Sequence, residues 1–388
     1  MQIEQNQFVA QPIPLRRWGF IAACLVGSAI LVVLVGDSTL SLLLYGASLL
    51  IVMGVALVVR HLHTFPDHRR WLAPLTIALL VGVLIFSRFG RLQILLFGTT
   101  IGRFGEWVGL SYLIFRLIHI VIDSKKLGDS VLRSGDLAAY ALFPPALVAG
   151  PIHRANQFLP QLDQPYYPTS QPKLLDSLWR IGLGLIKKLV LANALALYVL
   201  TPDIAANPAL PSGLLWLSLL AYTFMIYFDF AGYSDIAIGA AGLVGITLPE
   251  NFANPYAQPS ITRFWQAWHI SLSTWLRDYL FFPISRTLLT KLGRNYNTLI
   301  MAVAHLTTMA LAGLWHGFTT GFLAWGLWHG VGLFIHAQFS GIAKRRNIVV
   351  SPVIGVSATF LFVMIGWVFF AMPSFTSALH FLSRLFGR

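Results

Sequence analysis

The stretch Val353-Ile-Gly-Val-Ser-Ala-Thr-Phe-Leu-Phe-Val-Met-Ile-Gly-Trp-Val-Phe-Phe370 contains no charged side chain and decides the class of fold. Four further runs, at 20–35, 40–59, 71–86 and 214–228, are similarly apolar. Each run approaches the ~20 residues that an α-helix needs to cross a hydrocarbon core about 30 Å thick. The chain is therefore predicted to be an integral membrane protein that crosses the bilayer several times.

The composition supports this class. Only 11% of the 388 residues are charged and 56% are hydrophobic, whereas soluble domains carry about a quarter charged residues. The formal net charge is +13, and the basic residues gather in short loops between apolar runs, which is typical of cytoplasmic loops beside anionic headgroups. No basic face interleaved with aromatic residues is present, so the expected partner is the lipid bilayer and no nucleic acid.

We expect an all-α fold in a single transmembrane domain over residues 1–388, with about ten or eleven membrane helices plus re-entrant and interfacial helices. Arg16 and Arg17 precede the first run and no cleavage site follows, which predicts an N-terminus anchored on the cytoplasmic side. Pro144 and Pro145 break one segment, which at membrane depth requires surrounding protein or water. The predicted segments are 18–36, 39–60, 71–87, 104–122, 136–150, 178–200, 212–229, 231–246, 297–314, 319–338 and 353–371.

Chemically informative residues concentrate in a motif-rich core at 222–336. Asp229 and Asp235 lie there in an otherwise membrane-like stretch. An ionised carboxylate in hydrocarbon costs several kcal/mol, so both must face protein, water or a cation. The leading expectation is pairing with an arginine that fixes helix packing; a direct role in a reaction is the second.

The segment from Ser260 to Tyr279 is predicted to be one amphipathic helix with Ser260 as its N-cap. Its aromatic character suits the membrane interface or the wall of an inner cavity. For His269 the residues alone allow a hydrogen-bonded packing role or a role in a site. One face would carry Phe264, Trp268, Ser271 and Trp275, and a neighbouring face His269, Ser273 and Arg277.

Two histidines mark the apolar run that follows. His305 interrupts it, and His316 follows Trp315 near a predicted helix end, eleven residues or about three turns later, on the same face. A low-dielectric site favours neutral imidazole, which can accept a proton from a hydroxyl during acyl transfer. The residues leave two alternatives open, a general base and a buried hydrogen-bonded histidine.

Other chemistries lack their motifs. The chain has no HExxH sequence, no Walker loop and no Gly-x-Ser-x-Gly elbow. None of its histidines falls in a tight metal-ligand spacing with carboxylates, so we expect no metal site and no tightly bound cofactor. The single cysteine, Cys24, excludes an intramolecular disulfide.

At these residues the sequence resembles the membrane-bound O-acyltransferase family, over roughly residues 105–385, and within it the bacterial alginate O-acetyltransferase-like branch. It departs from that pattern in two places: an arginine is usual before the Trp-His pair, where this chain has Gln266 and Ala267, and another after Trp-Val-Phe-Phe, where it has Ala371. The resemblance is carried by Tyr227-Phe-Asp-Phe-Ala-Gly-Tyr-Ser-Asp235, Pro249-Glu-Asn-Phe252, Phe264-Trp-Gln-Ala-Trp-His-Ile-Ser-Leu-Ser-Thr-Trp-Leu-Arg-Asp-Tyr279 and Gly313-Leu-Trp-His-Gly317, with support from Gly150-Pro-Ile-His-Arg154 and Gly366-Trp-Val-Phe-Phe370.

The resemblance implies a ring of tilted helices around a central tunnel, in which donor and acceptor reach one histidine from opposite sides. It implies that His316 is catalytic and that His269 assists it. His329, in the second Gly-Leu-Trp-His-Gly sequence at 326–330, is a secondary candidate. Supporting roles are expected among Asp229, Asp235, Arg277, Asp278, Trp315 and His305.

The implied function is transfer of an acyl group, acetyl in the first instance, across the bacterial inner membrane. The donor would be a cytoplasmic thioester, acetyl-CoA or an acyl-carrier protein thioester. The acceptor would be a hydroxyl of an extracytoplasmic polysaccharide or of a periplasmic partner protein. Two alternatives remain open, a transporter or flippase and a non-catalytic scaffold for a periplasmic acyltransferase.

Overall fold

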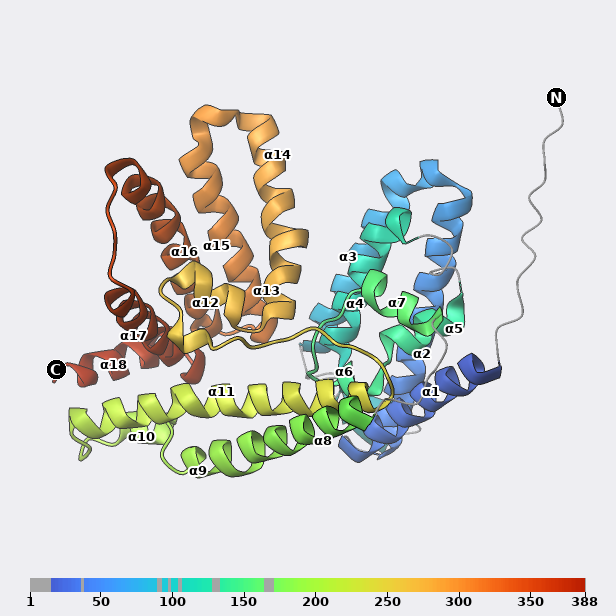
Figure 1. Cartoon of the computed structure of the whole chain (residues 1–388), viewed down its shortest axis with the longest axis horizontal. Coiled ribbons are helices and arrows are strands. Elements are labelled where there is room, and N and C mark those ends of the chain that lie inside the picture. Colours follow the sequence, from blue (N-terminus) through green and yellow to red (C-terminus); the bar gives the residue numbers. More distant parts are fainter. Residues whose placement is uncertain are drawn as a thin grey trace. The chain divides into compact units, whose positions relative to one another are not determined.

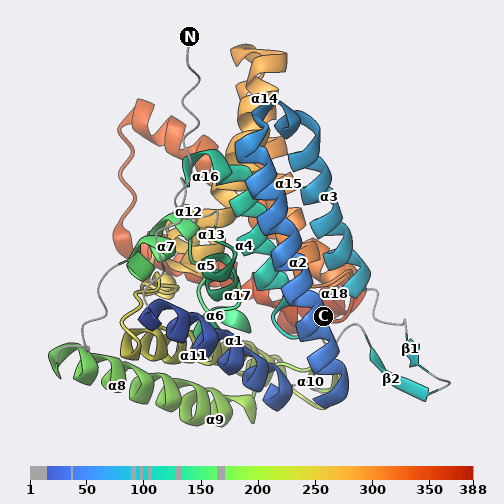
Figure 2. The ribbon, with the colours of Figure 1, turned by 90° about the vertical axis from the view of Figure 1, so that its right-hand side faces the viewer.

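A computed structural model describes residues 15–35, 38–88, 93–96, 99–103, 107–127, 133–163 and 171–387. The predicted cytoplasmic N-terminus at residues 1–14 lies outside these. Within the described ranges the regular elements are helices apart from one antiparallel hairpin of β1 (Gln93–Leu96) and β2 (Thr99–Arg103), visible in Figure 2. The predicted all-α class therefore holds except at this hairpin, which the sequence did not predict.

Six helices in the described part of the chain are long and apolar enough to cross a membrane. This confirms the predicted membrane class, but ten or eleven crossings are not confirmed. The segments predicted at 212–229 and 231–246 form one 32-residue helix, α11, instead. The six helices are α1 (Leu15–Val35), α2 (Ser38–Thr64), α3 (Arg69–Arg88), α11 (Ser212–Leu243), α15 (Asn297–His316) and α17 (Pro352–Ala371).

The described chain forms two compact units. The first, residues 1–148 and 154–168, contains α1, α2 and α3, and α2 lies beside α3 in Figure 2. Buried Arg17 on α1 forms ion pairs with Asp136 and Asp163, which tie three helices together. The remaining helices of this unit are α4 (Leu110–Asp123), α5 (Ser134–Ala141), α6 (Pro144–Leu147) and α7 (Ala155–Asp163).

The break predicted at Pro144 and Pro145 is confirmed, because α5 ends at Ala141 and α6 begins at Pro144. A proline at the first helical position needs no N–H donor, whereas inside a helix it removes a hydrogen bond. The predicted segment 136–150 is therefore two short helices, too short to cross a bilayer.

The second unit comprises residues 149–153 and 169–388. Its helices α8 and α11 run side by side (Figure 1), and a π-helical turn over Ile186–Ala192 continues α8. The other helices are α9 (Asn193–Ala196), α10 (Pro202–Ala206), α12 (Ile261–Ala267), α13 (Ile270–Leu276), α14 (Phe282–Leu292), α16 (Thr320–Arg346) and α18 (Phe375–Leu385), and α8 spans Gln171–Leu185.

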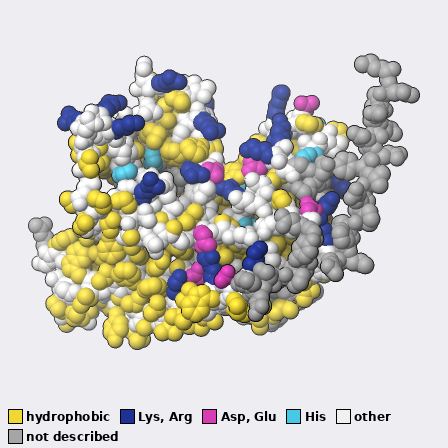
Figure 3. All heavy atoms as spheres, viewed as in Figure 1, with side chains coloured by type: hydrophobic (Ala, Val, Ile, Leu, Met, Phe, Trp, Pro, Cys, Tyr) yellow, Lys and Arg dark blue, Asp and Glu magenta, His cyan; other side chains and the backbone are white. Residues whose placement is uncertain are grey.

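Apolar side chains cover the outer surface over α8 and α9, as Figure 3 shows in yellow. Trp179 is 69% exposed and Leu197 77% exposed. A soluble protein rarely exposes so large an apolar surface, whereas lipid accepts it. The surface thus agrees with the membrane class indicated by the hydropathy.

Candidate functional site

His269 lies at a sharp break between α12 and α13. Its φ of 43° is left-handed, and its side chain is 3% exposed. The ring meets Phe230 edge-on at 4.6 Å between centroids. The N-cap predicted at Ser260 is confirmed, since its Oγ accepts from the Arg263 amide. The single helix predicted over this segment is wrong.

Because of this break, the residues predicted to share one face of a continuous helix do not all do so. Trp268 has an extended backbone, with φ of −103° and ψ of 126°, so the 3.6-residue period does not continue from α12 into α13. Phe264 and Trp268 still stack at 5.6 Å within an aromatic group. His269, in contrast, is directed by its own backbone conformation rather than by helical spacing.

His316 is the last residue of α15. It is half-buried, and four aromatic rings surround it. The ring centroids of Trp315, Phe370, Trp325 and Phe322 lie 4.5, 4.8, 5.3 and 5.9 Å from that of His316. The imidazole of His316 is therefore partly exposed and has apolar rings on several sides.

His316 contributes to the electrostatic environment of His269. Burial lowers the pKa of His269 from 6.5 to about 3, and the repulsion that a protonated His269 would meet from a protonated His316 is the second, smaller cause. His269 lies outside the six candidate membrane-spanning helices, but within electrostatic reach of His316. Their catalytic roles remain predictions.

His329 joins the same aromatic group from α16. It is fully buried, and the centroids of Trp265 and Trp325 each lie 5.2 Å from its own. Trp325 also contacts His316. Among the described residues, neither ring nitrogen of His329 has a hydrogen-bond partner. The two histidines of the repeated sequence, His316 and His329, therefore contact the same tryptophan, Trp325.

Comparison with known proteins decides the family. The family model described as membrane-bound O-acyltransferase matches residues 75–378. The chain belongs to the membrane-bound O-acyltransferase family. The resemblance seen in its motifs is thereby confirmed, and with it the assignment to the membrane.

Several relatives of this membrane-bound O-acyltransferase have curated names. It is 37% identical to the probable alginate O-acetylase of Pseudomonas fluorescens over 72% of its own length and 53% of the relative's. It is 32% identical to the peptidoglycan O-acetyltransferase of Helicobacter pylori over 65% and 46%, respectively. It is 34% identical to the teichoic acid D-alanyltransferase of Streptococcus thermophilus over 63% and 59%. The chain spans about half the length of the curated relatives it matches.

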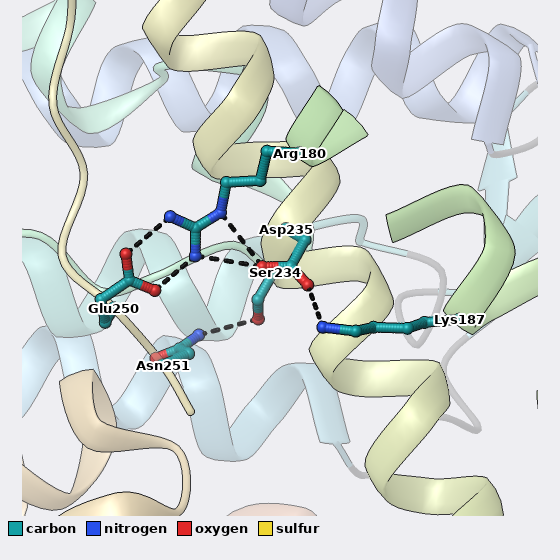
Figure 4. Close-up of polar contacts among 6 residues, drawn as sticks. All are labelled: Arg180, Lys187, Ser234, Asp235, Glu250 and Asn251. Atoms are coloured by element: carbon teal, nitrogen blue, oxygen red, sulfur yellow. Dashed lines mark hydrogen bonds and ion pairs between the residues drawn. The ribbon is translucent and has the colours of Figure 1, made fainter. Parts of the chain in front are cut away.

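In this family member, the two intramembrane carboxylates form ion pairs, as predicted. Asp235 accepts from Arg180 Nε at 3.1 Å and from Lys187 Nζ at 2.6 Å (Figure 4). Asp229 pairs with Lys188. The partners therefore include two lysines besides the expected arginine, and the pairs join α11 to α8 and its π-helical turn.

Three other predicted supporting residues are in local contacts. Arg277 and Asp278 pair with each other at 3.0 Å in a π-helical turn (Arg277–Phe281), where Arg277 is half exposed. His305 shares the continuous helix α15 with His316, as predicted, but its Nδ1 lies 2.8 Å from the Met301 carbonyl of the same helix. That contact favours the packing alternative for His305.

Sequence reasoning assigned no role to Asn251 or Trp325. Asn251 stands in the quoted Pro249–Phe252 motif, and Trp325 precedes the second Gly-Leu-Trp-His-Gly sequence. Both are buried. No group of three or more His, Cys, Asp or Glu side chains among the described residues could hold a metal ion.

We predict that acid destabilises the protein partly through His269. Its folded-state pKa of about 3 lies below the ordinary 6.5, so between these values the unfolded chain binds more protons and stability falls as pH falls. Thermal unfolding of detergent-solubilised protein at pH 7.5 and 5 measures this. The His269→Gln variant should lose less stability than the wild type between these pH values. An equal loss would contradict the prediction.

Proposed function

We propose that this protein transfers an acyl group from a thioester to a hydroxyl, with His316 as general base. The supporting observation is a half-buried histidine at the end of a membrane helix, coupled electrostatically to His269 and walled by aromatic rings. Family membership supports the same reaction class.

The reaction follows from neutral imidazole chemistry. His316 accepts the hydroxyl proton while the hydroxyl oxygen attacks the thioester carbonyl carbon. A carbon–oxygen bond forms and the carbon–sulfur bond breaks. The departing thiolate takes a proton, and the imidazole returns to its neutral form. Aromatic side chains exclude water that would otherwise hydrolyse the thioester. The Trp315 indole N–H and His269 are candidate donors to the developing oxyanion.

The donor proposed is acetyl-CoA at the cytoplasmic face of the bacterial inner membrane, with an acyl-carrier protein thioester as the second choice. Basic side chains lie at the ends of α14 and α16, at Lys291, Arg294 and 344–346. Figure 3 shows Lys and Arg side chains at this end of the second unit. Positive charge there raises the local concentration of an anionic donor.

The acceptor proposed is a hydroxyl on an extracytoplasmic polysaccharide, or on a partner protein that completes the transfer. Two relatives carry names that specify O-acetylation, of alginate and of peptidoglycan. A third is named for transfer of D-alanine to teichoic acid. These names favour a polymer of the cell envelope as the final acceptor and an acetyl group as the first acyl group to test.

Reconstituted protein is expected to release free CoA from acetyl-CoA when a hydroxyl acceptor is present, and to leave the acetyl group on that acceptor. Vesicles carrying acetyl-CoA on one side and polysaccharide, with or without periplasmic extract, on the other provide the measurement. A transporter would move substrate without consuming the thioester. A scaffold would show no release above protein-free vesicles. Either result would overturn the proposal.

A further inference from the structure

The left-handed backbone of His269 needs an explanation. Among the described residues, the other non-glycine positions with positive φ are asparagines, Asn254 and Asn347. Asparagine visits this region readily, whereas other L-residues there cost roughly 1–2 kcal/mol. A histidine in this conformation must be held by its surroundings.

The backbone at 251–253 holds both sides of His269. The Asn251 carbonyl accepts from the Ile270 amide at 2.9 Å, and the Ala253 amide donates to the Ala267 carbonyl at 3.0 Å. Phe252 and Trp268 form the bridge between these bonds. His269 is thus enclosed between two hydrogen bonds to one short segment, which stops α12 from continuing into α13.

The Asn251 side chain completes this hold. Its Oδ1 accepts from the Ser271 hydroxyl at 2.7 Å and from the Ser271 amide at 3.3 Å. Its Nδ2 donates to Ser234 Oγ at 3.1 Å, as Figure 4 shows. Ser271 Oγ in turn accepts from the Ile152 amide at 2.9 Å. All three side chains are at least 95% buried, so these bonds have no competition from water.

The ion pairs fix the two ends of this arrangement. Ser234 precedes Asp235, and Asn251 follows Glu250. Arg180 binds both carboxylates, with its Nη1 2.6 Å from a Glu250 oxygen and its Nη2 3.0 Å from Asp235 (Figure 4). One guanidinium therefore sets the spacing between α11 and the 249–251 segment, from which Asn251 reaches Ser271.

We propose that Asn251 is a positioning residue that holds His269 in its left-handed conformation. The expected effect on kcat rests on the proposed function. The expected effect on the conformation of His269 does not depend on it. Removing the amide leaves the backbone bonds of 251–253 in place but releases α13 at Ser271. His269 then loses its fixed orientation, while the ion pairs of Arg180 stay in place.

The test combines kinetics with a double-mutant cycle. Asn251→Ala should lower kcat by about ten- to a hundred-fold with little change in KM for the donor, because a displaced assisting group acts on the reaction step. His269→Ala should cost much less in the Asn251→Ala background than in the wild type, because its position is already lost. Asn251→Asp, which keeps the acceptor for Ser271, should recover part of the rate.

Ser218→Ala is the matched control, since Ser218 is a buried residue on α11 whose hydroxyl, among the residues that the structure describes, donates to the Leu215 carbonyl of its own helix. It should leave kcat unchanged. Hydrogen exchange of peptides covering 268–273 gives a readout independent of activity and should speed up in Asn251→Ala alone. Two results would overturn the positioning role. One is an unchanged hydrogen-exchange rate in Asn251→Ala; the other is a double variant whose loss in kcat equals the product of the losses of Asn251→Ala and His269→Ala. An inactive wild type would instead contradict the proposed function and leave the exchange result to decide this inference.

Discussion

Replacing His316 with alanine is expected to lower acyl transfer by about a hundred- to ten-thousand-fold, the usual contribution of a general base. His316 is the last residue of α15 and is half-buried, so its truncation removes no core side chain from the helix. The folded fraction should remain close to that of the wild type. The measurement is kcat for CoA release by purified, reconstituted protein, with size-exclusion profiles recorded for both samples.

His305→Ala is the matched comparison, because it removes the same ring from the same helix. Its Nδ1 is engaged with Met301, so its loss should change kcat no more than a few-fold. If the His316 variant keeps near-normal transfer while folded, His316 is not the base. If both variants lose transfer equally, the effect belongs to α15 as a whole rather than to one imidazole.

Replacing Gly326 with leucine is expected to prevent correct folding. A Cβ on Gly326 would lie 2.2 Å from the Met309 carbonyl oxygen, and one on Gly313 would lie 2.2 Å from that of Phe322. The backbones of α15 and α16 therefore touch, and a side chain would force them apart. Overpacking on this scale costs about 3 kcal/mol or more. Recovery of monodisperse protein and its thermal midpoint should both collapse.

Gly341→Leu is the control on the same helix, since no described residue beyond its own helical turn lies within 4 Å of a Cβ at Gly341. It should express and unfold like the wild type. A stable, monodisperse Gly326→Leu protein would show that α15 and α16 can separate without loss of the fold. The close contact would then be a detail of packing and not a condition for assembling His316 and His329 around Trp325.

Hydropathy alone predicted the membrane class, because each apolar run carries its own signal. It failed at α11, where Asp229 interrupts the apolar pattern and suggests two segments. The helix nevertheless continues through Asp229, which forms an ion pair with Lys188 of the neighbouring π-helical turn. The partner of Asp229 lies 41 residues earlier in the sequence, so no local pattern contains this contact.

The sequence was enough to name the histidines of the candidate site but not to predict their geometry. His269 and His316 stood out through motifs, yet helical spacing placed His269 on a continuous face that does not exist. Asn251 selects the break through hydrogen bonds from another segment. The repeated Gly-Leu-Trp-His-Gly sequence was visible, but only packing shows that its first glycines, Gly313 and Gly326, lie where α15 and α16 meet.

The π-helical turn over Ile186–Ala192 constrains how this sequence can change in length during evolution. Neighbouring Lys187 and Lys188 reach two different carboxylates of α11, Asp235 and Asp229. Deleting one residue just before this turn would rotate everything beyond it by about 100° relative to α8. Both lysines could not then keep their partners. Homologous sequences should therefore gain or lose residues in connecting loops. Through the turn they should keep the same number of residues even where the residue types differ.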